Sequence, residues 1–311
     1  MKYGIKIGNI KVDILLYADD IIIMASTING MVEMLKKLEC FGKENEIKFN
    51  VAKTFIMIIH PTKETKRNKR RNFSHHVNLN DINFKLDNVT IPVVKCIRYL
   101  GVYINNKLTN TDHLDNKINE LATKVNKING IGFSSYCLKP LTKSFYYNTY
   151  IRPYLLYGIE HFHFNKGEMK RIQTAEANII KTALNLSYSL ANSELLLALN
   201  IEKSSYQIDM NKLSLFNGLT NNSYTKKIIH EIIEEGKYYK INDSLISEIF
   251  RITGSVNMNI EEIVKENNKK LNMMKNSFND ERENNEEVIE ICNFFKKLNF
   301  HREITDFLGC Y

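Results

Sequence analysis

The 311-residue sequence lacks the patterns that mark secreted, membrane-spanning and zinc-binding proteins. Its five cysteines are odd in number, scattered, and never arranged as a Cys-x-x-Cys pair, so they supply neither a disulfide framework nor a zinc site. No apolar run approaches the roughly 18–20 residues that cross a bilayer. Charged residues interrupt every apolar run near the N-terminus, so no signal peptide is expected. We therefore expect an intracellular protein of the nucleus or cytoplasm, not secreted and without a membrane partner.

What the sequence does contain is apolar content and positive charge. Hydrophobic residues make up 43% of the chain, enough for real cores and too much for global disorder. The formal net charge of +8 favours polyanionic partners, either nucleic acid or an acidic membrane surface. Part of this charge is concentrated in a basic run that contacts phosphate groups, acts as a nuclear localisation patch or forms a solvated loop. The run contains Lys66, Arg67, Lys69, Arg70 and Arg71.

Residues 13–26, DILLYADDIIIMAS, place Asp19 and Asp20 between two apolar runs. The β-branched content of the second run favours a strand, and acidic residues favour turns over sheet interiors. The simplest local structure is a hairpin with both aspartates at its tip. A carboxylate among buried apolar strands is costly unless it is paired, hydrogen-bonded or bound to a cation. The stretch is therefore either a cation site or a solvated turn.

The neighbouring segments predict strands and one helix in a single layer. Residues 3–14 alternate as a pair of strands. A helix with Ser26 as its N-cap and Gly42 at its end follows, with apolar residues at helical spacing from Met31 to Phe41. Further strands are expected at residues 47–50, 55–59, 84–91 and 97–104, with a turn at residues 87–88.

From about residue 108 the spacing of apolar residues becomes helical. Amphipathic helices are expected over residues 114–128, with Asp112 as cap, and over residues 170–186. Residues 138–165 are rich in aromatics, which either stack on bases or belong to the core. Pro153 interrupts or begins a helix there. The chain as a whole predicts an α+β fold.

Four short motifs occur in order along residues 1–200. They are YADD at residues 17–20, ENEIKFNVAKT at 44–54, YLGV at 99–102 and YIRPYLLYGIEHF at 150–162. In this order they resemble the reverse transcriptases, and most closely those of non-LTR (LINE-type) retrotransposons. The second motif matches at Ile47, Asn50, Lys53 and Thr54 but lacks the glycine that the family has there.

The resemblance implies a polymerase architecture and activity. It implies a partial palm, an antiparallel sheet with a packed helix, at residues 1–106. A helical thumb-like region would follow at residues 107–235, and a helical tail at 236–311. The implied reaction is RNA-directed DNA synthesis by nucleotidyl transfer, with an RNA template, a DNA primer and dNTP as partners.

The resemblance also implies roles for individual residues. Asp19 and Asp20 would be catalytic ligands of Mg²⁺, with Asp19 the principal one, because successive strand residues point to opposite faces. Lys53 would donate a proton to the departing pyrophosphate or steady its charge, or else it is a surface lysine. The Tyr99-Leu100-Gly101 segment would grip the primer end, and it also suits a strand that ends in a glycine turn.

Several parts that the family needs precede its YADD motif and have no counterpart here. They include a further palm carboxylate and the fingers that hold template and nucleotide. We therefore expect a truncated polymerase that is inactive alone, with the missing N-terminal half as a possible partner, and that exposes an apolar sheet edge. The alternative is a non-catalytic nucleic-acid-binding remnant of a retroelement. A helical structural protein with a chance YADD is the third hypothesis.

Overall fold

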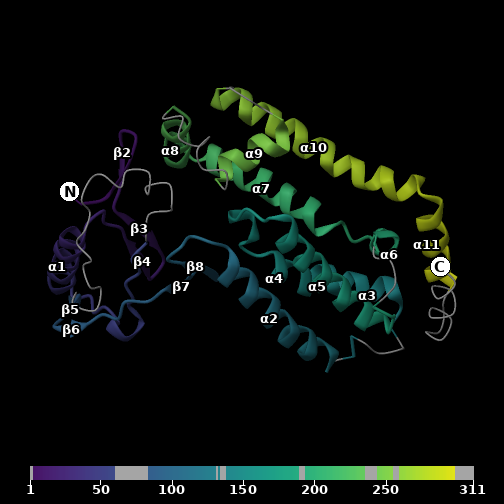
Figure 1. The fold of residues 1–311 in the computed structure, drawn as a ribbon, viewed down its shortest axis with the longest axis horizontal. Coiled ribbons are helices and arrows are strands. Elements are labelled where there is room, and N and C mark those ends of the chain that lie inside the picture. The colour runs from purple at the N-terminus through teal and green to yellow at the C-terminus, as the bar shows by residue number, and fades with distance from the viewer. Residues whose placement is uncertain are drawn as a thin grey trace, which may run out of the picture. The chain divides into compact units, whose positions relative to one another are not determined.

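The structure, a computed structural model, consists of two compact units (Figure 1). Unit 1 comprises residues 1–112 with 227–237, and unit 2 comprises residues 113–226 with 238–311. The division into a palm, a thumb-like region and a tail stays a prediction. The residues that the structure describes are 3–59, 83–130, 132–133, 138–188, 193–234, 244–254 and 259–297.

Unit 1 is built largely from antiparallel hairpins and one long helix, α1. Consecutive strands pair with each other, and no sheet within the described residues has more than two strands. Such isolated pairs leave strand edges and faces for other elements to cover. The hairpins are β1 (Ile5–Ile7) with β2 (Ile10–Val12), β3 (Ile14–Tyr17) with β4 (Asp20–Ile23), β5 (Lys85–Leu86) with β6 (Val89–Thr90), and β7 (Cys96–Tyr99) with β8 (Val102–Asn105).

Left-handed turns of two residues close the last two hairpins. Asp87 and Asn88 have φ of 50° and 63°, and Leu100 and Gly101 have φ of 47° and 80°. Two successive positive φ values give a turn whose twist matches that of the paired strands. Asp, Asn and Gly adopt this conformation more readily than leucine does. The turns predicted at these two places are confirmed.

Helix α1 (Ile28–Glu44) has different boundaries from those predicted. Thr27, not Ser26, is the N-cap, because its hydroxyl accepts a hydrogen bond of 3.0 Å from a backbone N–H of the first turn. Gly42 lies inside the helix and is buried, so it does not end it. A Cβ on Gly42 would come within 2.8 Å of the Phe49 ring, so this glycine allows close packing instead.

The core of unit 1 lies against α1. Leu35 of this helix packs with apolar residues from the β5–β6 hairpin and the segments beside it. These residues come from parts of the chain far apart in sequence, so they join the helix to the hairpin. The buried members of the cluster are Leu35, Ile56, Phe84, Leu86 and Ile91.

The segment between α1 and β5 differs from its prediction. Strands are expected at residues 47–50 and 55–59, but the described chain forms no strand there. Val51–Lys53 form a 3-10 turn, and Ile56 makes a single parallel bridge with Val93. The apolar residues of this segment pack in the cluster beside α1. Such packing does not require the segment to be paired in a sheet.

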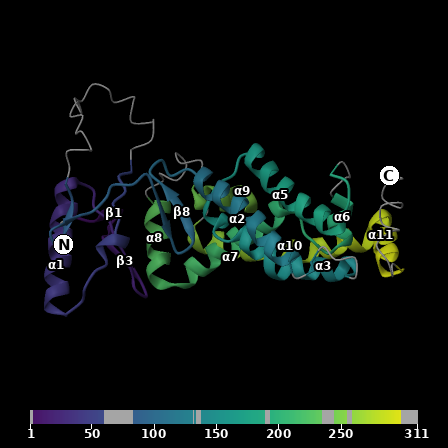
Figure 2. The ribbon, with the colours of Figure 1, turned by 90° about the horizontal axis from the view of Figure 1, so that it is seen from below.

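Unit 2 is helical, and its core takes residues from most of its helices (Figure 2). Asp112 lies in the first turn of α2 and does not precede it, which corrects its predicted role as a cap. The helices are α2 (Thr111–Asn129), α3 (Pro140–Tyr146), α4 (Arg152–Leu156), α5 (Lys166–Leu184), α6 (Ser193–Ala198), α7 (Ser204–Asn221), α8 (Ser223–Glu234, shared with unit 1), α9 (Leu245–Thr253), α10 (Ile260–Asn284) and α11 (Glu286–Lys297).

Helices α3 and α4 form one continuous helical run. A π-helical turn, Tyr147–Ile151, joins them and widens the run by one residue. Pro153 lies in the first turn of α4 directly after the π-helical turn, so the change from π- to α-helical hydrogen bonding falls next to the residue that lacks a backbone N–H. The α+β class is confirmed by the hairpins of unit 1 and the helices of unit 2. None of the described helices has the length and apolarity to cross a membrane.

Candidate functional site

The two adjacent aspartates lie at the tip of the β3–β4 hairpin, as predicted. Tyr17 pairs with Asp20 across the hairpin, so Ala18 and Asp19 form a two-residue turn. Ala18 has φ of 51°, a left-handed conformation that hairpin turns use and that alanine adopts at a cost. The backbone thus holds Asp19 in the turn and Asp20 at the start of β4.

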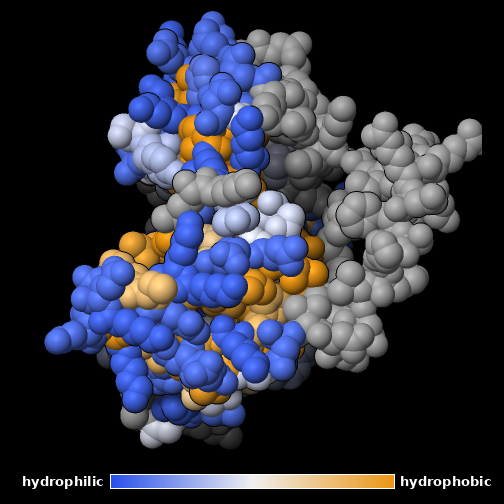
Figure 3. Space-filling model, turned by 90° about the vertical axis from the view of Figure 1, so that its left-hand side faces the viewer, coloured by the Kyte–Doolittle hydropathy of each residue, from blue (hydrophilic) through white to orange (hydrophobic). Residues whose placement is uncertain are grey.

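Both carboxylates are exposed, and so are the apolar strands beside them. Leu15, Leu16 and Tyr17 are 42%, 69% and 62% exposed. The idea that these apolar runs surround the aspartates with a core is therefore wrong for this structure, and water can solvate both carboxylates. Apolar strand residues of this hairpin therefore face solvent, while the predicted truncation of a palm stays a prediction. Figure 3 shows hydrophobic side chains open at the surface among hydrophilic ones.

The two aspartates have the ligand chemistry of a divalent-cation site, but two carboxylates are too few to complete one. Their oxygens are the hard ligands that Mg²⁺ prefers. Within the described part of the chain, no three His, Cys, Asp or Glu side chains gather into a group that could hold a metal ion. Asp19 and Asp20 would therefore need further oxygen ligands from water, substrate or another segment.

Lys53 lies at the end of the 3-10 turn and is exposed. The carbonyl of Asn50 accepts hydrogen bonds from the Lys53 backbone N–H at 3.1 Å and from the Thr54 hydroxyl at 2.9 Å. The turn thus brings together three residues of the second motif. Among the described contacts, no hydrogen bond or ion pair joins Lys53 to either aspartate.

Tyr99, Leu100 and Gly101 form the end of β7 and its turn into β8. Leu100 is 37% exposed, and its φ of 47° presents it at the tip of the hairpin. Tyr99 is half-buried and pairs with Val102. This segment and the aspartates lie on separate two-stranded sheets. The basic run Lys66, Arg67, Lys69, Arg70 and Arg71 lies outside the described residues.

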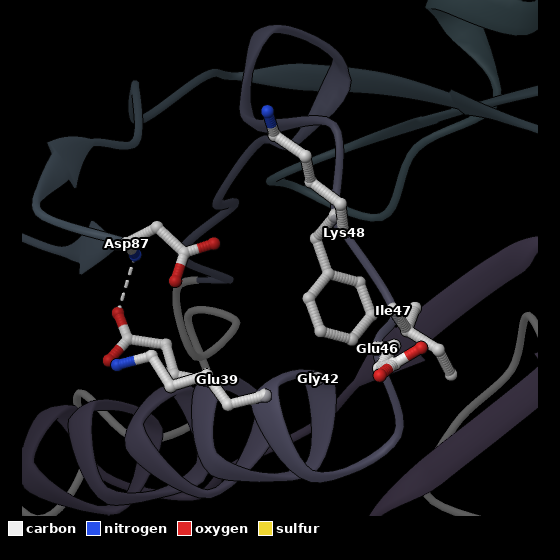
Figure 4. A pocket seen from close by; sticks show the side chains of 8 residues that line it. Glu39, Gly42, Glu46, Ile47, Lys48 and Asp87 are labelled. Carbon is white, nitrogen blue, oxygen red and sulfur yellow. Dashed lines mark hydrogen bonds between the residues drawn. The ribbon is translucent and has the colours of Figure 1, made fainter.

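A shallow open pocket of about 180 Å³ lies between α1, the segment after it and the β5–β6 turn (Figure 4). In it the Asp87 backbone N–H donates to Glu39 Oε1 at 2.6 Å. The charges of both signs that line it show no preference for one class of ligand, and none of the predicted site residues contributes. The lining residues are Glu39, Gly42, Lys43, Glu46, Ile47, Lys48, Phe49 and Asp87.

Unit 2 buries two groups of charged residues that the sequence pattern does not distinguish from a solvated face. In the first, Glu176 Oε1 accepts a hydrogen bond from the Tyr147 hydroxyl at 2.8 Å and lies 3.0 Å from Arg152 Nε. The Ser204 hydroxyl donates to the other carboxylate oxygen. Burial, together with the Glu176 charge, raises the pKa of Tyr147 well above its usual range. We call these four residues the Glu176 cluster.

The second group surrounds Glu248, whose side chain is 5% exposed. Its carboxylate contacts Lys212 Nζ at 2.6 Å, His163 Nδ1 at 2.7 Å and Arg251 at 3.2 Å. Burial alone raises the pKa of Glu248, but the hydrogen bonds from Arg251, Lys212 and His163 outweigh it and lower that pKa to about 2. Both groups join separate helices of unit 2, so they fix these helices against one another.

Comparison with known proteins identifies one family. Residues 4–104 match the family model described as reverse transcriptase (RNA-dependent DNA polymerase). The match covers the four hairpins of unit 1 up to β8, with Asp19, Asp20 and Lys53 inside it. No curated protein matches the chain.

Proposed function

From the premise that residues 4–104 carry reverse transcriptase sequence, we propose that the chain is part of an RNA-directed DNA polymerase of the non-LTR (LINE) type. Members of the reverse transcriptase family use divalent metal ions and act on a template, a primer and dNTP. One observation carries the proposal: the family match coincides with a hairpin turn that presents two adjacent carboxylates to solvent. The non-LTR type rests on the order and spacing of the four sequence motifs.

In this proposal the turns at Asp19, Lys53 and Leu100 have roles in nucleotidyl transfer. Asp19 and Asp20 would hold Mg²⁺, with Asp19 as the principal ligand. The bound ion would activate the attacking 3′ oxygen and neutralise charge on the phosphate. Lys53 would give a proton to the departing pyrophosphate. The turn at Leu100 and Gly101 would bind the primer end, since Leu100 is 37% exposed at the tip of β7–β8.

The proposal includes inactivity of this chain on its own. Asp19 lies in the turn and Asp20 begins β4, so the hairpin tip offers an ion two carboxylates. No third ligand group stands beside them among the described residues. The exposed apolar hairpin offers a surface on which another polypeptide segment could bring the further carboxylate.

Two measurements test the proposal. In the first, Mn²⁺ is titrated into the ¹⁵N-labelled chain, and paramagnetic broadening of amide signals is followed. We expect selective broadening at residues 17–21, and its loss in Asp19→Ala. Glu261 and Glu262 are adjacent exposed carboxylates in the first turn of α10, so Glu261→Ala is a matched control that leaves the broadening at residues 17–21 unchanged. Uniform broadening would contradict the assignment of the metal ligands.

The second measurement is primer extension on an RNA template with Mg²⁺. We expect no extension by the purified chain. Extension that disappears in Asp19→Ala would overturn the proposed inactivity while it supports the polymerase assignment. Extension that survives in Asp19→Ala would contradict the assignment of Asp19.

A second function, a non-catalytic nucleic-acid-binding protein, is favoured by the two-carboxylate site together with the net charge of +8. It predicts salt-sensitive binding of nucleic acid without selective Mn²⁺ broadening at the hairpin. The two functions therefore differ at the Mn²⁺ titration.

A further inference from the structure

The helical run of residues 140–156 buries several polar side chains and exposes several aromatic ones. Lys143, Ser144 and Arg152 are 2%, 4% and 7% exposed, although such residues are usually at the surface. Phe145 and Tyr150 of the same run are 63% and 61% exposed. The run also buries Tyr147, Ile151 and Leu155, each 0% exposed, so it packs an apolar stripe against the core and presents further aromatic rings to solvent.

The buried polar residues are fixed by specific bonds. Lys143 Nζ donates to the Ala183 carbonyl at 2.5 Å, at the C-terminal end of α5. Ser144 donates to the Leu199 carbonyl, and Arg152 belongs to the Glu176 cluster. These bonds hold one face of the run against the rest of unit 2, so the opposite face is directed to solvent.

The outward face carries a row of tyrosines. Tyr146, Tyr150, Tyr154 and Tyr157 follow one another at intervals of four, four and three residues, which places them on one side of the run. Tyr146 and Tyr157 are 38% and 52% exposed. The rings of Tyr146 and Tyr150 are stacked, with centroids 6.0 Å apart and planes at 25°, and Phe145 meets Tyr146 edge-on at 6.0 Å. We call these five residues the aromatic face.

Positive charge accompanies this face. Lys117 Nζ lies 4.4 Å from the Tyr154 ring centroid and 5.0 Å from that of Tyr157, and Lys124 Nζ lies 5.0 Å from that of Tyr154. Lys124 is exposed, and so is Lys139, which directly precedes α3 at the other end of the row. Lys117 is 2% exposed and Tyr154 packs against the core, so their contact belongs to the packing of unit 2, and Lys124 and Lys139 are the charges that solvent reaches. Exposed lysines together with open aromatic rings are the combination that binds single strands, through phosphates and base stacking.

We propose that the aromatic face of unit 2 binds single-stranded nucleic acid. Bases stack on Phe145, Tyr146 and Tyr150, and Lys124 and Lys139 contact phosphates. The net charge of +8 favours a polyanionic partner over an apolar protein surface, and stacked open rings fit bases better than they fit lipid headgroups. The binding involves neither Asp19, Asp20 nor Lys53, so it does not rest on the proposed polymerase.

The absence of tryptophan from the chain allows a direct test. Tyr150→Trp places a single tryptophan on the aromatic face, and Tyr224→Trp places one on α8, where Tyr224 is 50% exposed. Both variants of the full chain are titrated with oligo(dT) and oligo(rU) while tryptophan fluorescence is recorded. We expect quenching by stacked bases in Tyr150→Trp and none in Tyr224→Trp.

Affinity is measured by the anisotropy of fluorescein-labelled oligo(dT). Phe145→Ala combined with Tyr150→Ala removes two exposed rings without touching the core, and we expect binding to weaken by about tenfold or more. Phe145→Tyr combined with Tyr150→Phe keeps both rings and is expected to bind as the wild type does. Tyr224→Ala is the matched control for the loss of an exposed tyrosine.

Unchanged affinity in the double alanine variant would overturn the proposal. So would a Tyr150→Trp signal that responds to anionic vesicles or to rising protein concentration but not to oligonucleotide, because it would identify a lipid or a second copy as the occupant. Asp19→Ala is expected to bind oligo(dT) as the wild type does. Failure of the proposed polymerase function and failure of this binding surface are therefore separate results.

Discussion

The two units depart from the usual distribution of side chains in opposite ways. Unit 1 places apolar side chains outside, on the β3–β4 hairpin, where Leu16 is 69% exposed. Unit 2 places charged side chains inside, with Glu176 and Lys212 each at most 2% exposed. Soluble proteins normally do neither without a reason.

The units differ in whether other residues of the same unit neutralise or cover these side chains. In unit 2 every buried charge just named has its counter-charge within the unit, at distances of 2.6–3.0 Å. In the described part of unit 1, no other segment covers the apolar hairpin in this way. The comparison teaches that unit 2 pairs its unusual side chains within itself, whereas the unit that contains the family-model match leaves apolar strand residues exposed.

The largest expected effect comes from breaking the Glu176 cluster. Glu176→Ala removes the nearest counter-charge of the buried Arg152, leaving it with Glu202 at 4.0 Å, and removes the acceptor of the Tyr147 and Ser204 hydroxyls. We expect the free energy of unfolding to fall by about 3–5 kcal/mol. Urea unfolding followed by far-UV circular dichroism measures this loss.

The surface ion pair of Asp115 and Arg171 provides the matched control. Its atoms are 2.6 Å apart, closer than those of the buried pair, but both side chains are about half exposed. Asp115→Ala is therefore expected to cost at most about 1 kcal/mol. Equal losses in Asp115→Ala and Glu176→Ala would show that burial does not distinguish the two pairs and would break the comparison.

Acid is expected to act on unit 2 through Glu248. The folded pKa of about 2 lies below the ordinary value of 4.5, so the folded state binds the proton less readily than the unfolded state. The resulting stability is fully present above pH 4.5 and is lost as the pH falls from 4.5 to about 2. The gap between the two values corresponds to about 3 kcal/mol.

Urea unfolding of the wild type and of Glu248→Gln over this pH range measures the effect. We expect the difference in free energy between the two proteins to shrink as the pH falls, because protonation removes the charge that the variant already lacks. A difference that stays constant with pH would mean that the contacts of Lys212, His163 and Arg251 contribute no stability that depends on the charge of Glu248.

Local features of unit 1 could be predicted from the sequence. Strand alternation and turn residues lie within a few positions of each other, so the hairpin at Asp19 and the turns at Asp87 and Gly101 follow from local chemistry. The position of both aspartates at a hairpin tip was predicted for the same reason. The roles of Asp19, Asp20, Lys53 and the Tyr99 segment stay predictions.

Features that depend on distant partners could not be predicted. Ser26 and Thr27 are both suitable N-caps, and only the position of the first turn decides between them. Gly42 resembles a helix end in sequence, but its closeness to Phe49 depends on how the chain folds back. The burial of Glu248 depends on Lys212 and His163, which are remote in sequence. The exposure of the β3–β4 strands is likewise set by which other segments are present to cover them.

The smallest expected effect tests the open hairpin of unit 1. Leu16 is 69% exposed, and threonine favours strands, so Leu16→Thr removes little buried surface and keeps the strand. We therefore expect the free energy of unfolding to change by no more than about 0.5 kcal/mol. Leu86→Ala in the core of the same unit, where Leu86 is 0% exposed, is expected to cost about 2–5 kcal/mol. Hydrogen exchange of the α1 and β5–β6 amides measures both. A loss in Leu16→Thr as large as that in Leu86→Ala would show that β3 is covered in solution, and the contrast between the two units would disappear.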